Sequence, residues 1–263
     1  MAQAKTTWGV GDYPSMALKL EPVAAAAVHS VPLGPGSRVL DIATGTGNAA
    51  LMAAQLGAVV TAVDIEPVLI ELAEQRARMG GVDIRWLLGG CERLPVADAA
   101  FDVVFSILGV MYAADHAAAA RELDRVTAPG GRVVLASWQP GSVMPVMGQV
   151  LGGFLPPPPP SSGPPSRWGD DEALREILLA SDLGLESTVS GQVTLTFANA
   201  AEGASFLIAT AGHVVSERER MTRLGTWTAL HRELTNFVND RGDLSDDGIA
   251  LRLDYLLATA FKS

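Results

Sequence analysis

The stretch VLDIATGTGNAA, residues 39–50, runs from apolar residues through an acid into a group of small residues. Its first part is typical of a short buried strand, and its last part continues as an alanine-rich helix that ends at Gly57. Glycines in such a turn let the backbone approach a ligand closely, and the free N–H groups of the following helix favour an anionic group. The sequence therefore predicts a ligand-binding turn at Gly45 and Gly47.

The same alternation of strand and helix continues through the first half of the chain. Strands are expected at residues 38–42, 58–63, 84–88, 101–106 and 132–138, and helices at 48–57, 66–81 and 113–131. Strands that alternate with helices form a parallel sheet with helices on both faces. The ligand of such an open sheet lies beyond the carboxyl ends of its strands, where we place the glycine-rich turn.

The second half has a different pattern. After a stiff proline-rich stretch, we expect a helix at 170–184, a strand at 186–198, mostly helix from 201 to 240, and a closing strand at 251–262. The late strands are expected to join the first sheet, which gives an α/β, Rossmann-like, mostly parallel seven-stranded sheet. Within a single domain of residues 1–263, the expected parts are an N-terminal helical flap (1–35), a cofactor-binding core (36–140), a proline-rich linker (155–168) and a helical cap insertion (201–240).

Composition limits the classes of function. Of the 263 residues, 48% are hydrophobic, which is enough for a large core, and the formal net charge is -10. A chain this acidic is a poor partner for nucleic acid, because that affinity depends on basic residues. The single cysteine, Cys91, excludes a disulfide within the chain and a metal site built from cysteines. We predict no metal site.

The sequence also predicts a cytoplasmic protein that does not cross a membrane. The N-terminal region has acidic and basic residues before any apolar run, unlike a signal peptide. Residues 133–166 contain no charge, but prolines and glycines interrupt every stretch there, and a membrane span needs roughly 20 continuous apolar residues.

Three ligand classes suit a glycine-rich turn, namely phosphate, a nicotinamide dinucleotide and a sulfonium nucleoside. A phosphate-binding P-loop requires a Lys-Ser/Thr pair after its last glycine, and Asn48-Ala49 stands there instead. GTGNAA does match the dinucleotide pattern G-x-G-x-x-A. Asp41, however, would crowd a pyrophosphate and suits a cationic amino group. Asp64, at the end of the second strand, is placed to bind a ribose diol, and it also suits a helix N-cap.

The motifs VLDIATGTG, VTAVDIEPVLIELA and LPVADAAFDVVFSILGVMYAADHAAAARELDRVTAPGGRVVLASW together resemble a class I S-adenosylmethionine-dependent methyltransferase of the group called type 11. The resemblance covers roughly residues 36–138. It extends more loosely to WGVGDY and the closing strand. It implies S-adenosylmethionine as cofactor, S-adenosylhomocysteine as product, and methyl transfer to oxygen, nitrogen or carbon of a small metabolite.

The resemblance also implies which residues contact the cofactor. They are Asp41, Ala43, Gly45, Gly47, Asp64, Ile65, Gly90, Cys91 and Ser106. The acid and the turn after the first strand hold the methionine end, Asp64 the ribose, and Ile65 lies beside the adenine. Gly90 stands where the family commonly has an aspartate for the adenine amino group, so the backbone N–H of Cys91 is left to serve the ring nitrogen. Ser106 matches a residue whose backbone meets the methionine part.

The sequence says less about the residues that contact the methyl acceptor. His116 and His213 are the candidates for a base, if the nucleophile must lose a proton, and both also suit a surface or capping role. Candidate substrate residues are Tyr13, Met111, Tyr112, Met144 and Met147. Methionine and aromatic side chains at such spacings more often belong to the core, and if several of them face the site, the acceptor is a small, largely apolar molecule. The resemblance further implies that the segment with Trp8, Asp12 and Tyr13 folds over the cofactor as a flap.

Two other functions remain open at this point. One is an NAD-linked oxidoreductase, although the chain lacks a recognisable Tyr-x-x-x-Lys pair. The other is a non-catalytic module that binds S-adenosylmethionine. The acceptor, the atom that is methylated and the oligomeric state, monomer or homodimer, are not defined by the sequence.

Overall fold

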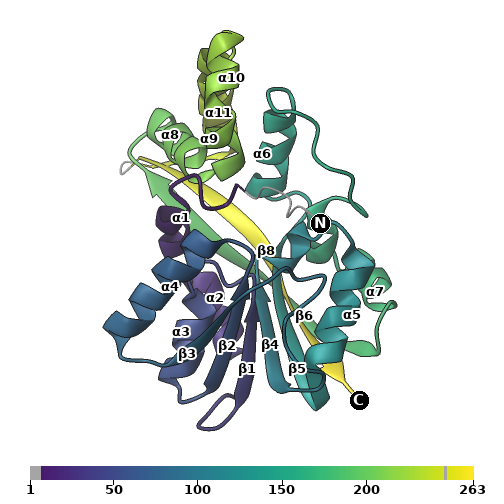
Figure 1. Cartoon of the computed structure of the whole chain (residues 1–263). Coiled ribbons are helices and arrows are strands. Elements are labelled where there is room, and N and C mark those ends of the chain that lie inside the picture. The colour runs from purple at the N-terminus through teal and green to yellow at the C-terminus, as the bar shows by residue number, and fades with distance from the viewer. Residues whose placement is uncertain (1–6, 246–247) are drawn as a thin grey trace.

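A computed structural model describes residues 7–245 and 248–263, which form an α/β fold around one sheet (Figure 1). The strands are β1 (Arg38–Ile42), β2 (Val59–Asp64), β3 (Ile84–Leu88), β4 (Phe101–Ile107), β5 (Thr127–Trp138), β6 (Leu183–Phe197), β7 (Asp243–Ser245) and β8 (Gly248–Lys262). Their order is β3-β2-β1-β4-β5-β8-β6, and β7 pairs with β8. Strands β1 to β5 are parallel, and β8 runs antiparallel between β5 and β6. The expected Rossmann-like fold is confirmed.

Helices cover both faces of this sheet. They are α1 (Tyr13–Lys19), α2 (Glu21–His29), α3 (Asn48–Gln55), α4 (Pro67–Gly80), η1 (Val110–Tyr112), α5 (His116–Val126), α6 (Val143–Gly152), η2 (Pro165–Gly169), α7 (Asp171–Leu178), α8 (Ala200–Thr210), α9 (Gly212–Ser216), α10 (Arg218–Arg223) and α11 (Trp227–Arg241). On one face α2 packs against α3 and α3 against α4, and on the other α5 packs against α7 (Figure 1). In the part of the chain that the structure describes, no helix is both long and apolar enough to cross a bilayer.

Local sequence signals explain the boundaries of α4. They did not reveal the end of α5. Pro67 opens α4, and Gly81 ends it in a left-handed conformation, as expected. The prediction that the next helix runs to residue 131 was wrong, because α5 ends at Val126. Thr127 turns extended there and its hydroxyl donates to the Leu123 carbonyl, so the chain already enters β5.

The second half adds more strand than the sequence predicted. β6 and β8 are each 15 residues long and pair from Leu183 opposite Lys262 to Phe197 opposite Ile249. The short β7, which raises the sheet from seven strands to eight, was not expected, because three exposed residues carry no apolar pattern. The helix before β6 is correspondingly shorter than predicted and ends at Leu178.

The end of the proline-rich stretch belongs to the core. Residues 155–164 contain no regular element, but η2 follows directly and its Trp168 is fully buried. A Cβ on the next residue, Gly169, would collide with the Trp138 carbonyl. The expected linker therefore ends in a residue that is packed against β5 rather than in a free spacer.

A cap of four helices, α8 to α11, lies between β6 and β7, as expected (Figure 1). α8 packs on α11, and α1 packs on α8. The Asp12 N–H at the start of α1 donates to the Ala209 carbonyl at 2.8 Å. The cap and the N-terminal helix are thus joined beyond the carboxyl ends of the parallel strands.

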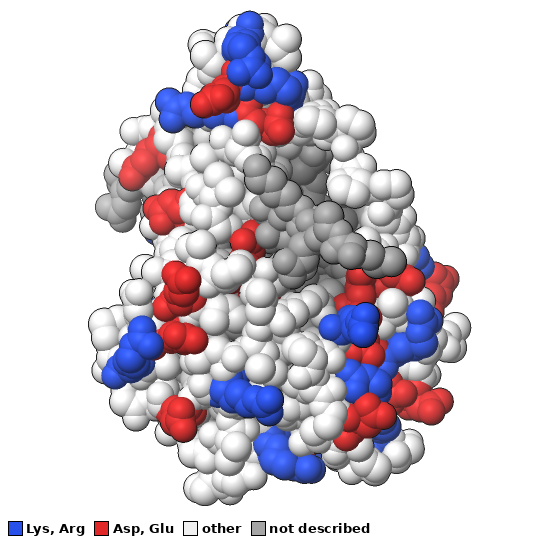
Figure 2. Space-filling model, in the orientation of Figure 1, with Lys and Arg blue, Asp and Glu red and all other residues white. Residues whose placement is uncertain are grey.

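Charge is distributed unevenly over this arrangement (Figure 2). Basic and acidic side chains gather at the tip of the cap, where Figure 1 places α10 with Arg218, Arg220 and Arg223, and over the lower part of the same face. The described surface between these two regions carries few charged residues.

Candidate functional site

The turn after β1 has a backbone that requires small residues. Ala43, Gly45 and Gly47 have φ angles of +54°, +56° and +84°. A Cβ on Gly45 would lie 3.0 Å from the Tyr13 ring, and a Cβ on Gly47 would lie 3.0 Å from the Trp86 ring. The two glycines are therefore needed both for their left-handed conformation and for the close approach of aromatic rings.

Asp41 is buried at the carboxyl end of β1, next to this turn. It is 2% exposed, and its Oδ2 accepts hydrogen bonds from the Thr44 hydroxyl at 2.6 Å and from the Ala50 N–H at 3.1 Å. Burial, opposed by these two hydrogen bonds, raises the pKa of Asp41 to about 7. No hydrogen bond to Oδ1 is present among the described residues, so that oxygen can still accept one.

Asp64 is the last residue of β2, the strand next to β1, and it holds the turn in place. It is 5% exposed, its Oδ2 accepts from the Gly45 N–H at 2.7 Å, and its Oδ1 accepts from the Glu66 N–H at 2.9 Å. Burial raises its pKa, and the backbone hydrogen bonds oppose that shift. Two buried carboxylates thus flank one glycine turn.

Arg76 on α4 fixes the far side of the turn, a role that the sequence did not reveal. Its Nη1 donates to the Thr46 carbonyl at 2.8 Å and to Asn48 Oδ1 at 2.6 Å, and its Nη2 donates to Glu21 at 2.8 Å. The only sequence signal would have been an arginine on the helix that follows Asp64. The side chain joins α2, α4 and the start of α3.

Ser106 links the turn to the neighbouring strand β4. Its hydroxyl is fully buried, donates to the Ile42 carbonyl at 2.9 Å and accepts from the Val110 N–H at 2.9 Å. A Cβ on Gly109 would lie 2.5 Å from the Ala43 Cβ, so the loop after β4 packs directly on the turn. The loops after β1 and β4 are therefore in direct contact and form one continuous surface.

α1 covers the turn and leaves a small cavity of about 30 Å³. Its lining is Tyr13, Ala17, Leu20, Ala24, Asp41, Ala43, Thr44, Thr46, Asn48, Ala49, Ile107 and Leu108. Ligand pockets usually measure about 300–1,000 Å³, so this cavity is too small to hold a ligand of that size as it stands. Burial, followed by the negative charge of Asp64, raises the pKa of Tyr13, and its hydroxyl stays protonated at neutral pH.

A wider groove of about 710 Å³ lies elsewhere, beside the second residue of β3 and the first of β4. Arg85, Arg93 and Phe101 are among its lining residues. Its position near the amino ends of the strands separates it from both carboxylates. In an open α/β sheet the ligand lies at the carboxyl ends, so we place the functional site at the smaller cavity.

Comparison with known proteins identifies the family. Residues 40–135 match the family model of a methyltransferase domain. An uncharacterized protein of Mycobacterium tuberculosis, Rv1405c, is 35% identical over 187 residues, which are 71% of this chain and 68% of the relative. The chain belongs to the class I S-adenosylmethionine-dependent methyltransferases.

Two further comparisons concern a named relative and a solved structure. Demethylmenaquinone methyltransferase of Thermus thermophilus is 41% identical over 105 residues, 39% of this chain and 48% of that protein. The crystal structure of YcgJ from Bacillus subtilis superposes with a TM-score of 0.63 at 19% identity, over 92% of this chain and 98% of that one. This likeness shows the fold.

The residues predicted to contact the adenine lie close together after β2 and β3. A Cβ on Gly90 would lie 3.8 Å from the Ile65 Cδ1, and the Gly89 N–H donates to the Asp64 carbonyl at 2.9 Å. Burial, reinforced by the charge of Glu92, raises the pKa of Cys91 to about 12. The thiol is therefore protonated at neutral pH, in agreement with a space-filling rather than a nucleophilic role.

The candidate acceptor residues separate into two groups. Met111 and Met147 are 1% and 5% exposed and belong to the main hydrophobic core, and Met144 is partly buried against it. Tyr112 is 43% exposed, and its ring lies 4.8 Å from the ring of Trp8, centroid to centroid. Of the predicted acceptor residues, Tyr13 lines the cavity described above.

The two candidate bases lie outside that cavity. His213 is exposed on α9 of the cap. His116 is 2% exposed, packs edge-on against Trp168 at 5.7 Å, and neither ring nitrogen has a hydrogen-bond partner among the described residues. Neither histidine is among the residues that line the cavity.

His116 is expected to make the fold sensitive to acid. Burial, followed by the charge of Arg167, lowers its pKa, and Asp115 and Glu92 only partly oppose this. Below about pH 6.5 the unfolded chain binds a proton at this residue that the folded chain does not, so the free energy of unfolding falls as pH decreases. In thermal unfolding between pH 7.5 and 5, His116→Phe should lose less stability than the wild type. His29→Gln, at an exposed histidine, is the control, and equal acid sensitivity of all three proteins would contradict the prediction.

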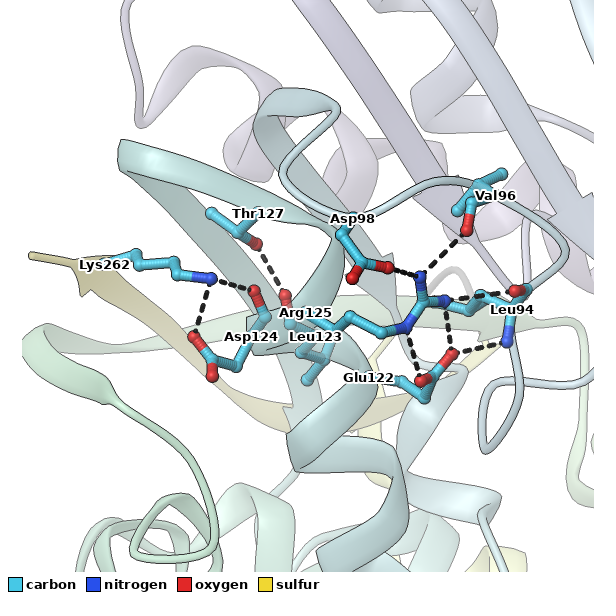
Figure 3. A network of polar contacts seen from close by, with 9 residues as sticks. All are labelled: Leu94, Val96, Asp98, Glu122, Leu123, Asp124, Arg125, Thr127 and Lys262. Carbon is cyan, nitrogen blue, oxygen red and sulfur yellow. Dashed lines mark hydrogen bonds and ion pairs between the residues drawn. The ribbon is translucent and has the colours of Figure 1, made fainter.

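Arg125 on α5 fastens the segment that follows β3 (Figure 3). Its guanidinium donates to Glu122 at 2.7 Å, to Asp98 at 2.6 Å, and to the carbonyls of Leu94 and Val96 at 3.1 and 2.9 Å. Glu122 also accepts from the Leu94 N–H at 2.6 Å. No helix lies between β3 and β4, so this network positions the segment that carries Gly90 and its neighbours.

Arg125→Ala is expected to destabilise the protein by about 1–3 kcal/mol, because Glu122, with 15% of its side chain exposed, and two carbonyls lose their donor. Asp98 has 77% of its side chain exposed, so Asp98→Ala should change stability by no more than about 0.5 kcal/mol. Urea denaturation of both variants measures the difference. Equal urea midpoints for Arg125→Ala and Asp98→Ala would show that the whole network adds no more stability than the exposed ion pair between Arg125 and Asp98.

Proposed function

We propose that this protein binds S-adenosylmethionine at the turn after β1 and transfers its methyl group to a small, largely apolar metabolite. One observation carries the proposal. Two buried carboxylates, Asp41 and Asp64, lie at the carboxyl ends of adjacent strands on either side of a left-handed glycine turn. A ligand that carries a cationic amino group at one end and a ribose at the other matches this arrangement.

The donor and acceptor chemistry of the turn fits each part of the cofactor. Asp41 has an oxygen free for the amino group of the methionine end, and the N–H groups at the start of α3 suit its carboxylate. Asp64 is placed for the ribose, as acids at this position are in nucleotide-binding α/β proteins. Ile65 supplies an apolar surface for the adenine.

When bound, the cofactor supplies a methyl group on a positively charged sulfur. Methyl transfer would form a bond from the acceptor to the methyl carbon and break the carbon–sulfur bond, which leaves sulfur neutral. A neutral acceptor would take on the positive charge and then release a proton. Alignment of the acceptor and the exclusion of water from the reacting atoms are then the main tasks of the protein. α1, with Tyr13 over the turn, and the cap joined to it by Asp12 suit those tasks.

An apolar acceptor is supported by the surroundings of the site. Partly buried apolar side chains lie on α6 and on the cap helices, and the described surface below the charged tip of the cap carries few charges (Figure 2). They include Met144, Phe206 and Trp227. The Thermus relative is named for demethylmenaquinone, which supports an acceptor of this apolar kind.

The test is transfer of an isotopically labelled methyl group from S-adenosylmethionine into fractionated small-molecule extract, followed by mass spectrometry. The double variant Asp41→Asn/Asp64→Ala is the blank. A labelled product absent from the blank supports the reaction and identifies the acceptor. Calorimetric binding of the cofactor without transfer to any fraction favours a non-catalytic binding module. Binding of NAD in place of S-adenosylmethionine would favour an oxidoreductase.

A further inference from the structure

Glu66 is a buried carboxylate that no structural role explains. It is 7% exposed, and its Oε1 has no hydrogen-bond partner among the described residues. An unpaired buried polar atom of this kind costs stability, because it gives up its hydrogen bonds to water without a replacement. A water, an ion or a ligand that pairs with such an atom is one explanation for its presence in a fold.

The ordinary duty of a residue at this position is to cap a helix. Glu66 is the N-cap of α4, yet its side chain makes no hydrogen bond to the first turn of that helix. It extends instead toward the N-terminal segment, where a Cβ on Gly9 would lie 3.3 Å from its Oε2. The carboxylate is therefore directed under the segment that precedes α1 and Tyr13.

Glu66 lies next to the carboxylate that flanks the glycine turn. Its backbone N–H donates to Asp64 at 2.9 Å, and its negative charge helps to raise the pKa of Asp64. Arg76, which fixes the far side of the turn, is bonded to Thr46, Asn48 and Glu21, and neither Asp64 nor Glu66 forms an ion pair with a described residue. Two neighbouring acids without a cation between them form a site for neutral donors such as hydroxyl groups.

We propose that Glu66 is a second carboxylate for the ribose of the cofactor, accepting a hydrogen bond from one of the two ribose hydroxyls through Oε1. This inference rests on the proposed binding of S-adenosylmethionine. It makes Glu66 a residue that selects ligands with an intact ribose diol. The segment at Gly9 then covers the ribose once the nucleoside is bound.

The test measures the dissociation constants of S-adenosylhomocysteine and of its 2′-deoxy and 3′-deoxy analogues by calorimetry. The proteins are the wild type, Glu66→Ala, Glu66→Gln and, as control, Glu71→Gln, an exposed glutamate on the same helix. Glu66→Ala should weaken S-adenosylhomocysteine binding at least about tenfold, the effect expected for a lost charge-assisted hydrogen bond. The wild type should lose affinity when either hydroxyl is removed. For Glu66→Ala, removal of the ribose hydroxyl that Glu66 binds in the wild type should change the affinity less than about twofold.

Thermal unfolding distinguishes this role from a structural one. Glu66→Ala and Glu66→Gln should unfold at or above the wild-type temperature, because each removes a buried charge with an unpaired oxygen. The role of Glu66 would be overturned if Glu66→Ala bound S-adenosylhomocysteine within twofold of the wild-type affinity. It would also be overturned if both deoxy analogues lost as much affinity for Glu66→Ala as they do for the wild type. Either result would leave the proposed function intact. Absence of saturable binding to the wild type would overturn the proposed function itself.

Discussion

The affinity of the protein for S-adenosylhomocysteine is expected to fall by up to about tenfold per pH unit below pH 7, reaching about 100-fold at pH 5. The cause is Asp41, whose pKa burial raises to about 7 in the ligand-free protein. A cationic amino group favours the ionised carboxylate, so below pH 7 binding must release a proton from this residue. Above pH 7 the carboxylate is already ionised and the affinity should be constant until the ligand's own amino group titrates.

Calorimetry between pH 5 and 8.5, in pairs of buffers that differ in ionisation enthalpy, measures both the affinity and the protons released. The variant Asp41→Asn keeps an oxygen for the Thr44 hydroxyl and the Ala50 N–H but cannot ionise. It should bind more weakly at pH 8 and lose the dependence on pH below 7. The same slope in the wild type and in Asp41→Asn would show that another group, such as Asp64, titrates instead.

The ionisation of Asp41 should lower the stability of the fold as pH rises, while it raises the affinity for the ligand. Asp41 has a folded pKa above its ordinary value near 3.8, so between about pH 4 and 7 the folded protein holds a proton that the unfolded chain has lost. The stability that this proton provides is present at low pH and is lost as pH rises through 7. Asp41→Asn should therefore unfold at a higher temperature than the wild type at pH 8 while binding the ligand less well, as expected where a functional residue opposes stability.

The first half of the fold was predictable because its signals are local. A buried strand, a glycine turn and an alanine-rich helix follow one another within residues 38–57, and each has its own periodicity or cap. The same holds for β2 and α4, where Asp64 and Pro67 mark the boundary. The carboxyl-end position of both acids follows from the parallel order of the sheet alone.

The remaining features depend on contacts between distant segments, which no local pattern reports. Trp168 follows a run of prolines typical of a spacer, and only the fold shows that it is fully buried. Tyr13 lies 32 positions before Gly45 in the chain, yet its ring packs on that glycine. From the sequence, Glu66 had no predicted role beyond the start of a helix, because its unpaired oxygen becomes visible only when its neighbours are placed.

Replacing Asp64 by alanine should weaken the binding of S-adenosylmethionine and S-adenosylhomocysteine by about 10- to 150-fold, since a charge-assisted hydrogen bond contributes about 1.5–3 kcal/mol. Calorimetry at pH 8 measures this loss. The control is Asp83→Ala, which makes the same charge change at an exposed residue just before β3, at the opposite end of the sheet. That variant should bind both ligands as the wild type does.

Asp64 also accepts the N–H groups of Gly45 and Glu66, so a loss of affinity alone does not separate contact with the ribose from support of the turn. A 2′,3′-dideoxy analogue of S-adenosylhomocysteine separates them. If Asp64 contacts the diol, the analogue binds the wild type much more weakly than the parent ligand does, and this difference shrinks in Asp64→Ala. If the aspartate only supports the turn, the variant weakens both ligands equally and the difference between them persists. Unchanged affinity in a folded Asp64→Ala protein would mean that the nucleoside binds away from the end of β2.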